Sequence, residues 1–206
     1  MNNEKYTVYG MALSGNCHKV KTILDLSKAS YSWIDTDTRV QATRTPEYRA
    51  KNPNGEVPLL ELPDGRFLPE SNAILFYLSQ DTPYWPANDD AYAQAQVMRW
   101  MFFEQYSHEP YIAVNRARLA IFKTERPDDA AVRSRHEKGR KTLGVMNEHL
   151  RDNDFFATKN ISIADIALFA YTHVAHEGGF DLNEFSEVQA WLERLLDHGF
   201  SKMPPI

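Results

Sequence analysis

Three side chains capable of chemistry stand together near the start of the chain, in the segment Ser14-Gly15-Asn16-Cys17. The segment lies between a strand-like run and a helical pattern. Ligands of α/β layers bind in such loops, because the first amides of the helix carry partial positive charge. A hydroxyl or a thiol here therefore faces surroundings that favour an anion. The alternative is structural: Ser14 or Asn16 caps the helix, and Cys17 is a small core residue.

A second group of polar residues follows an unusually placed proline. Pro58 lies inside the apolar run 57–62, where a proline cannot donate to a strand ladder. A cis Val57–Pro58 bond resolves this, although only about 5–6% of X-Pro bonds are cis, and it turns the backbone of Val57 toward an extended, peptide-like ligand. Glu70 and Ser71 then open a helical pattern, where a carboxylate can bind an ammonium and a hydroxyl with helix amides can bind a carboxylate. Together these two groups suit the end of an amino acid.

The segment Ile161-Ser162-Ile163-Ala164-Asp165 carries a folding signal. Ser162 can cap the amide of Asp165 while the carboxylate reaches back to the amide of Ser162, which is the reciprocal pattern of a capping box. We expect a structural role for this pair.

Metal chemistry is not expected. A single cysteine cannot supply a thiolate cage, His108-Glu109 lacks the second histidine of a zincin helix, and His173 and His176 have no acidic third ligand nearby. The aromatic residues Trp100, Phe103 and Tyr106 are more often core than ligand site at such spacing.

Two kinds of element must position these groups. The first third of the chain alternates β-branched runs with helical spacing and has an Asp-Gly hairpin signal at 64–65. It predicts a small α/β layer with strands at 5–9, 31–34, 57–62 and 66–68 and helices at 14–29 and 71–78. The stretch 81–90 has two prolines and no periodicity, and we place the linker there.

The remainder predicts only helices, at 91–122, up to about 151, 162–176 and 184–198. Pro110 lies inside the first of them, and it removes a backbone bond and clashes with the preceding turn. We therefore expect a kink near Glu109 rather than two separate helices.

Composition excludes several classes of protein. The chain has 206 residues, 43% hydrophobic, with a formal charge of −5 and one cysteine. Such a chain can bury real cores, so disorder is excluded, and mild acidity without a basic block argues against nucleic acid. No apolar run approaches the roughly 20 residues that span a bilayer, and the start shows no signal peptide. We expect a soluble, cytoplasmic protein without a membrane partner.

The SGNC loop, the NPNGEVPLLEL and LPESNAILFYL segments and the SIAD capping box together resemble a cytosolic glutathione S-transferase. The segment RWMFFEQYSHEPYIAV is similar to the fourth helix of bacterial theta-like, serine-type members. The resemblance covers nearly the whole chain. It implies a thioredoxin-like glutathione-binding domain at 1–80 and an all-helical domain at 91–206. It also implies a detoxifying homodimer with glutathione as co-substrate, no metal, and a small electrophilic substrate.

The resemblance also implies roles for particular residues. Ser14 matches the catalytic serine, and Asn16 replaces the proline of the S-x-P-C pattern. Glu56 stands where many relatives have Lys or Gln, and it is a poor partner for a glycine carboxylate, so that contact must come from Arg44 or Lys51. The glutathione-binding residues implied are Asn16, Arg44, Lys51, Glu56, Val57, Pro58, Glu70 and Ser71. The electrophile pocket implied by analogy is lined by Met11, Leu13, Tyr106, His108, Tyr111 and Asn115.

The chemistry implied for Ser14 is stabilisation of a thiolate. A thiol with a pKa near 8.5 needs a shift of about 1.5 units, or about 2 kcal/mol, to be half ionised at pH 7. One hydrogen bond to a charged group contributes roughly 1.5–3 kcal/mol, which suffices. Two alternatives stay open. One is glutathione-dependent disulfide or peroxide reduction through Cys17 or two glutathiones, and the other is a binding protein that carries glutathione or apolar ligands without turnover.

Overall fold

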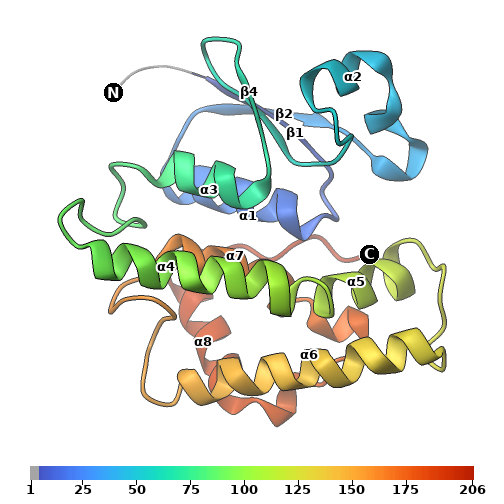
Figure 1. Ribbon diagram of the computed structural model, residues 1–206, viewed down its shortest axis with the longest axis vertical. Coiled ribbons are helices and arrows are strands. Elements are labelled where there is room, and N and C mark those ends of the chain that lie inside the picture. Colours follow the sequence, from blue (N-terminus) through green and yellow to red (C-terminus); the bar gives the residue numbers. More distant parts are fainter. Residues whose placement is uncertain (1–4) are drawn as a thin grey trace. The chain divides into compact units, whose positions relative to one another are not determined.

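The structure is a computed structural model that describes residues 5–206, and these form two units, each described by itself below. The first unit extends to Gln80 and takes in Met203–Pro205, and the second comprises Asp81–Lys202 with Ile206. Figure 1 shows the strands in the first unit and only helices in the second.

The first unit is built on one mixed sheet of four strands in the order β2-β1-β3-β4. Its strands are β1 (Tyr6–Gly10), β2 (Tyr31–Asp35), β3 (Leu59–Glu61) and β4 (Phe67–Pro69). β1 and β2 are parallel, whereas β3 is antiparallel to both β1 and β4. Val8 lies opposite Leu60 in the ladder, and both are fully buried. The alternation along β1 therefore directs one side of the strand into the core, as the sequence predicts.

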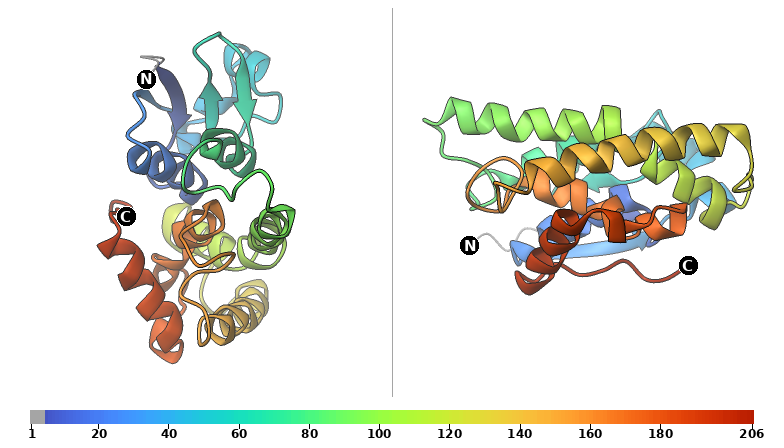
Figure 2. Two further views of the ribbon diagram at one scale, coloured as in Figure 1. Left: turned by 90° about the vertical axis from the view of Figure 1, so that its left-hand side faces the viewer. Right: turned by 90° about the horizontal axis from the view of Figure 1, so that it is seen from below.

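Helices flank this sheet. The helices of the unit are α1 (Gly15–Leu26), α2 (Pro46–Lys51) and α3 (Ser71–Ser79), with 3-10 turns at Thr38–Val40 and Ala42–Arg44. α1 and α3 pack together on one side of the sheet, where Val20, Leu24 and Ile74 join the core (Figure 2). α2 brings Tyr48 against Tyr9, with their ring centroids 6.2 Å apart. The predicted thioredoxin-like layer is confirmed.

Two predicted elements are shorter than expected for identifiable reasons. The first helix ends at Leu26 rather than Ala29, because Lys28 adopts the left-handed conformation with φ of 53°. The strand expected from Val57 begins at Leu59, since the Val57–Pro58 bond is cis and keeps these residues out of the ladder.

The second unit is helical throughout the described residues. Its α-helices are α4 (Ala91–Phe103), α5 (Ile112–Arg116), α6 (Ala130–His149), α7 (Ile163–Thr172) and α8 (Ser186–Asp197), with 3-10 turns at Ala175–Gly178 and Leu182–Glu184. Every residue of α7 is buried, so the most apolar helix forms the centre of the unit. The all-helical prediction is confirmed.

The chain accommodates Pro110 by widening the helix before it. A π-helical turn spans Glu104–His108, and the amide of Glu109 bonds to the carbonyl of Glu104 at 2.8 Å. The α-helix resumes only at Ile112. A π turn relieves the clash between the proline ring and the preceding turn, and it accounts for the interruption where a simple kink was expected.

The capping box at the start of α7 is confirmed. Asp165 is fully buried and accepts from the amide and the hydroxyl of Ser162 at 2.9 and 3.0 Å. It also accepts from the amide of Phe156 at 3.0 Å and from the indole Nε1 of Trp191 at 3.1 Å. Burial raises the pKa of the Asp165 carboxyl, against the four hydrogen bonds. One carboxylate thus joins the start of α7, the loop before it and α8.

Candidate functional site

Ser14 is the N-cap of α1. Its backbone is extended, with φ of −86° and ψ of 121°, and its Oγ accepts from the amide of Cys17 at 3.3 Å. The Ser14 hydroxyl also lies within hydrogen-bond reach of the Cys17 thiol. The side chain is half-buried. A donor at the positive end of a helix can therefore reach an anion bound beside it.

Cys17 is enclosed in the core of the first unit. It is fully buried, and its Sγ accepts from the amide of Met11 at 3.4 Å. Burial raises the pKa of this thiol from 9.0 to about 11, although the contacts with Ser14 and Met11 oppose the shift. The thiolate is the reactive form of a cysteine, so the structural interpretation of Cys17 is favoured over the redox one.

We predict that Cys17 resists thiol reagents in the native protein. Ellman's reagent should label it only after denaturation, because burial keeps the reagent away from the sulfur and disfavours the reactive thiolate. The raised pKa also predicts how Cys17 affects stability. Its contribution to the free energy of unfolding is fully present below pH 9 and is lost as the pH rises from about 9 to 11, because the thiol of the unfolded chain ionises first. Rapid stoichiometric labelling at pH 7.5, without unfolding, would contradict this assignment.

Two side chains fix the backbone just before the cis Val57–Pro58 bond. The Tyr48 hydroxyl and the Asn52 Nδ2 both donate to the carbonyl of Glu56, at 2.7 and 2.9 Å. Both side chains are buried, and burial also raises the pKa of the Tyr48 hydroxyl. With the Glu56 carbonyl fixed, the backbone of Val57, which forms no hydrogen bond within the described chain, is oriented for an extended ligand.

Tyr48 and Asn52 were missed by the sequence reasoning. A usable signal lay in the position of Asn52, which stands just before Pro53 and two residues before Asn54. Its Oδ1 accepts from the amide of Asn54 at 3.2 Å, which is the short-range bond that asparagine makes in turns.

Glu70 and Ser71 lie at the start of α3, as predicted. Glu70 adopts a left-handed backbone with φ of 72°, its side chain makes no capping bond, and the residue is exposed. Such a conformation costs of order 1–3 kcal/mol in a residue other than glycine, and it is found most often at functional sites. Nothing in the sequence indicated it. The carboxylate is thereby held at the surface beside the first amides of α3.

The starts of α1 and α3 are joined by hydrogen bonds. The Ser71 hydroxyl donates to Asn16 Oδ1 at 3.2 Å, and Lys19 Nζ lies 3.5 Å from Ser71 Oγ and 3.4 Å from Asn72 Oδ1. Lys19 is buried and places a positive charge beside Ser71. It lies three residues after Asn16, so helical spacing could have placed it on the same face. Two helix N-termini and an ammonium group thus converge where an anionic group could bind.

The two cations proposed for a carboxylate have different partners. Arg44 Nη2 lies 3.5 Å from the Glu56 carboxylate, and both side chains are exposed. Lys51 instead donates to the Tyr9 hydroxyl at 2.8 Å, and that hydroxyl donates to Glu61 at 2.7 Å. An exposed ion pair contributes only about 0–1 kcal/mol, so Arg44 can exchange its partner at little cost.

The six residues expected to line an electrophile pocket lie in different surroundings. In the first unit, Met11 is buried and Leu13 half-buried. In the second unit, Tyr106 is 83% exposed and Tyr111 is half-buried.

His108 and Asn115 have no exposed surface. The His108 Nε2 is 2.9 Å from the Thr172 hydroxyl, and Asn115 accepts from the Nε of Arg135 at 2.8 Å. These bonds hold helices of the second unit together. We therefore assign His108 and Asn115 to the packing of these helices rather than to a pocket.

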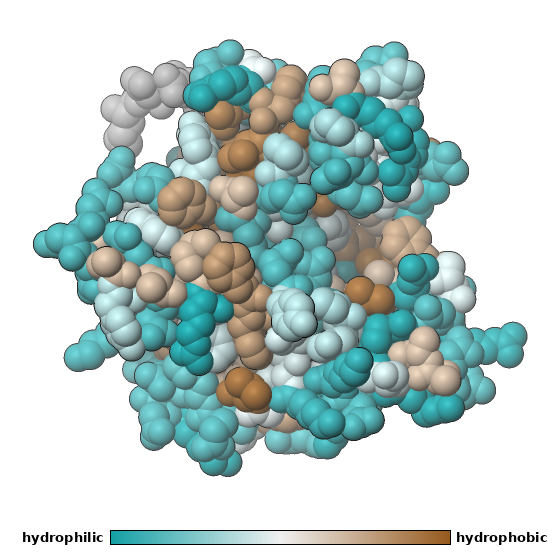
Figure 3. All heavy atoms as spheres, viewed as in Figure 1, coloured by the Kyte–Doolittle hydropathy of each residue, from teal (hydrophilic) through white to brown (hydrophobic). Residues whose placement is uncertain are grey.

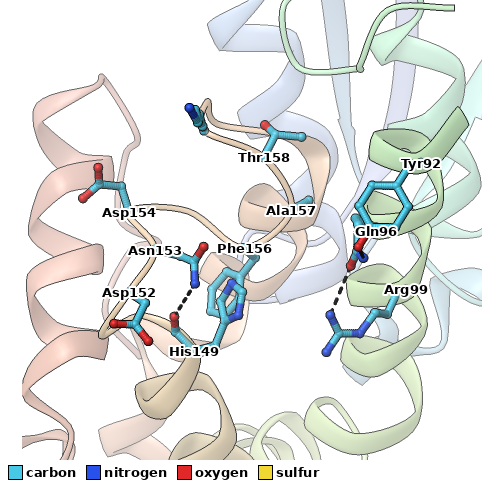
Figure 4. Close-up of a pocket in the computed structure, with 11 residues that line it drawn as sticks. Tyr92, Gln96, Arg99, His149, Asp152, Asn153, Asp154, Phe156, Ala157 and Thr158 are labelled. Atoms are coloured by element: carbon cyan, nitrogen blue, oxygen red, sulfur yellow. Dashed lines mark hydrogen bonds between the residues drawn. The ribbon is translucent and has the colours of Figure 1, made fainter. Parts of the chain in front are cut away.

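A polar cavity of about 630 Å³ lies in the second unit between α4 and the loop after α6 (Figure 4). On one side Gln96 donates to the Tyr92 hydroxyl at 2.8 Å and accepts from Arg99 at 3.1 Å. Asp152 and Asp154 line the other side, so the charges of the walls are mixed.

Two features are absent from residues 5–206. No group of three or more His, Cys, Asp or Glu side chains is placed to hold a metal ion. None of the helices described combines the length and the apolar character that crossing a membrane requires.

Both halves of the chain match models of known families. A model described as "Glutathione S-transferase, N-terminal domain" matches residues 8–86, and one described as "Glutathione S-transferase, C-terminal domain" matches residues 100–198.

Solved structures agree over nearly the whole chain. A glutathione S-transferase from Pseudomonas fluorescens Pf-5 is 43% identical, with a TM-score of 0.92, and the match covers 97% of this chain and 99% of that one. A possible glutathione S-transferase from Rhodopseudomonas palustris is also 43% identical, with a TM-score of 0.92 and 98% of each chain covered. A complex of Ure2p with S-hexylglutathione is 25% identical, with a TM-score of 0.84, 95% of this chain and 96% of that one.

Curated relatives are more distant. The glutathione S-transferase-like protein LUC7 of a Fusarium species is 31% identical over 164 residues, which are 75% of this chain and 72% of that protein. Elongation factor 1-gamma of Equus caballus is 31% identical over 131 residues, which are 62% of this chain and 28% of that protein.

Proposed function

Since both family models match it, the chain belongs to the glutathione S-transferase family and is a glutathione transferase, and we propose that it ionises the glutathione thiol at Ser14. The hydroxyl donates to the thiolate, and the sulfur then attacks a small electrophile. With a chloro-nitrobenzene, a carbon–sulfur bond forms, chloride leaves and the thiol proton passes to water. Ser14 is neither nucleophile nor base. This assigns the chain to the serine-type, theta-like members of the family.

One observation carries this proposal. The Ser14 hydroxyl stands at the N-terminus of a twelve-residue helix and is only half-buried, whereas the neighbouring thiol of Cys17 is fully buried. The test is conjugation of glutathione to 1-chloro-2,4-dinitrobenzene and to a panel of other electrophiles. Turnover that requires glutathione supports the proposal. Calorimetric binding of glutathione with no turnover on any of them would favour the binding protein.

The residues around Ser14 fit the rest of a glutathione molecule. The backbone of Val57 can pair with the cysteinyl part as an added strand does, and Glu70 can bind the γ-glutamyl ammonium. The γ-glutamyl carboxylate suits Ser71, the amides of α3 and the charge of Lys19. Arg44 is the better cation for the glycine carboxylate, because its exposed pair with Glu56 is readily exchanged.

Reduction is the second enzymatic possibility, and the burial of Cys17 leaves mainly the two-glutathione route for it. Incubation with oxidised glutathione followed by intact-mass analysis distinguishes the routes. We expect no adduct on Cys17. An adduct that turns over would contradict the conjugation proposal and assign the reaction to the cysteine.

A homodimer is the assembly we propose, through an aromatic stripe of Tyr92, Phe102 and Tyr106 along α4 and the turn after it. These side chains are 75%, 65% and 83% exposed. They recur at spacings of ten and four residues, which place them on one side of a helix. Apolar side chains are visible on the surface in Figure 3. Exposed apolar groups gathered in this way mark interaction sites.

We predict that Phe102→Asp converts the dimer to a monomer, because a charge in an apolar interface must be desolvated without a partner. Light scattering after size exclusion measures the mass. Val145→Asp is the matched control, since Val145 is 50% exposed on α6, outside the aromatic stripe. A monomeric wild type, or a Phe102→Asp variant that stays dimeric, would contradict the assembly.

We propose the cytoplasm as the compartment and detoxification of electrophiles as the role. Reducing conditions there keep a lone cysteine as a thiol. Recovery of the protein in a membrane or secreted fraction after cell fractionation would contradict the compartment.

A further inference from the structure

The strand pairing of the first unit fixes where the two ends of an extended ligand lie. Leu59 pairs with Pro69 in the ladder between β3 and β4. The start of α3, which follows Pro69 directly, therefore lies toward Pro58. A ligand that extends along the backbone of Val57, with its γ-glutamyl end at the start of α3, directs its other end toward Glu56.

A cation is built into the loop at that second end. The guanidinium of Arg44 packs on Gly55, because a Cβ added at this glycine would lie 3.0 Å from the arginine Nη1. The φ of Gly55 is 64°, which also favours glycine there. The same Nη1 donates to the carbonyl of Asn54 at 3.4 Å. The arginine is thereby held against the loop at residues 54–56.

The carboxylate of Glu56 lies beside this cation. It is 3.5 Å from Arg44 Nη2, and 67% of the Glu56 side chain is exposed. The backbone of Glu56 is fixed as well, since its carbonyl accepts from Tyr48 and Asn52. The two charges of the pair cancel, so a carboxylate bound here meets one attraction and one repulsion of similar size.

The other cation considered for this end, Lys51, is committed to the packing of α2 on the sheet. Its Nζ lies 4.4 Å from the centroid of the Tyr9 ring and 5.2 Å from that of the Phe67 ring. It also donates to the Tyr9 hydroxyl, which donates in turn to Glu61. Moving this ammonium toward a ligand would break these contacts, so the Arg44–Glu56 pair sets the charge at the ligand's second end.

We infer that Glu56 determines the specificity of the site at the glycine end of its thiol substrate. The inference rests on the proposed function and names the class of thiol: γ-glutamyl-cysteinyl peptides whose C-terminal carboxylate is blocked as an amide or extended by an amine. A neutral end meets no repulsion from Glu56, and an ammonium can pair with its exposed carboxylate. Glutathione itself is accepted but not preferred.

Three thiols that differ only at the glycine end test the inference. They are glutathione, its glycine amide and its N-(2-aminoethyl) amide, which carries an ammonium. Calorimetry measures the dissociation constant of each for the whole protein, and we expect the wild type to bind all three within about threefold of one another. Glu56→Gln should favour glutathione over the amine-bearing thiol at least about fivefold, because one charge about 4 Å away in water changes an affinity by that factor.

Arg44→Gln should change the preference in the opposite direction, toward the amine-bearing thiol, because it leaves the Glu56 carboxylate without its arginine. Both changes should shrink in about 0.5 M salt, whereas a purely structural change of the loop would not respond to salt. Asp64→Asn is the matched control. It removes the carboxylate of another exposed pair, with Arg66 at 2.7 Å, and should leave all three dissociation constants as in the wild type.

Two results would overturn the inference. One is a wild type that binds glutathione more than about tenfold more tightly than its amide, and the other is a Glu56→Gln variant with unchanged ratios. These binding ratios do not depend on turnover. The expected ratios without conjugation of any electrophile would support the inference and contradict the proposed function, whereas normal conjugation with unchanged ratios would contradict the inference alone.

Discussion

Replacing Ser14 by alanine is expected to lower kcat/KM for glutathione conjugation by about 10- to 100-fold. The hydrogen bond to the thiolate contributes roughly 1.5–3 kcal/mol, and each 1.4 kcal/mol is a factor of ten in rate. The bond stabilises the thiolate and therefore lowers the pKa of the bound thiol. At neutral pH the variant should therefore hold less thiolate than the wild type and lose more activity. At a pH high enough to ionise glutathione unaided, the loss of kcat/KM should be smaller. The measurement is the pH profile of conjugation of 1-chloro-2,4-dinitrobenzene in wild type and Ser14→Ala.

Two controls separate chemistry from folding. Ser14→Thr keeps both the hydroxyl and the N-cap and should retain most of the activity, and Ser30→Ala removes a hydroxyl before β2 and should behave as wild type. Loss of the cap alone costs about 1 kcal/mol of stability, which a denaturation curve reports. A Ser14→Ala enzyme with unchanged kcat/KM at neutral pH would show that another group activates the thiol.

Asp165→Ala is expected to lower the free energy of unfolding by about 3–5 kcal/mol, without any part in the reaction. Removal of the carboxylate leaves the donors of Ser162, Phe156 and Trp191 buried and unpaired, and each unpaired donor costs about 1–3 kcal/mol, partly recovered by relaxation. A typical domain has only about 5–15 kcal/mol in total. Urea denaturation followed by circular dichroism measures the change.

The matched control for Asp165 is Asp197→Ala, at the exposed end of α8, which should change the stability by less than about 0.5 kcal/mol. A difference below 1 kcal/mol between the two variants would mean that the capping box is not the structural centre assigned to it. Soluble but inactive Asp165→Ala of normal stability would instead give this carboxylate a functional role.

Local patterns predicted most of the fold. The alternation in 5–9 and the Asp-Gly turn at 64–65 placed the strands, and the reciprocal pair Ser162 and Asp165 placed the start of α7. The position of Pro58 in an apolar run showed that the strand needed an irregularity there, for which a cis bond was one explanation, and the structure contains that bond. In each case a few neighbouring residues determine the geometry.

Features that depend on distant residues were not predictable. The left-handed backbone of Glu70 has no local signal, and the burial of Lys19 beside Ser71 depends on residues 52 positions apart. The helix after 91 is rich in apolar residues on several sides, so its facing was ambiguous. This is why His108 was expected in a pocket but is buried against Thr172.

The measurement closest to the central claim is the pKa of the glutathione thiol bound to the wild-type protein, followed through the ultraviolet absorbance of the thiolate. A free thiol has a pKa of about 8.5, and the account predicts about 7 or lower in the complex, returning toward the free value in Ser14→Ala. A bound thiol that titrates with the pKa of the free one would contradict it.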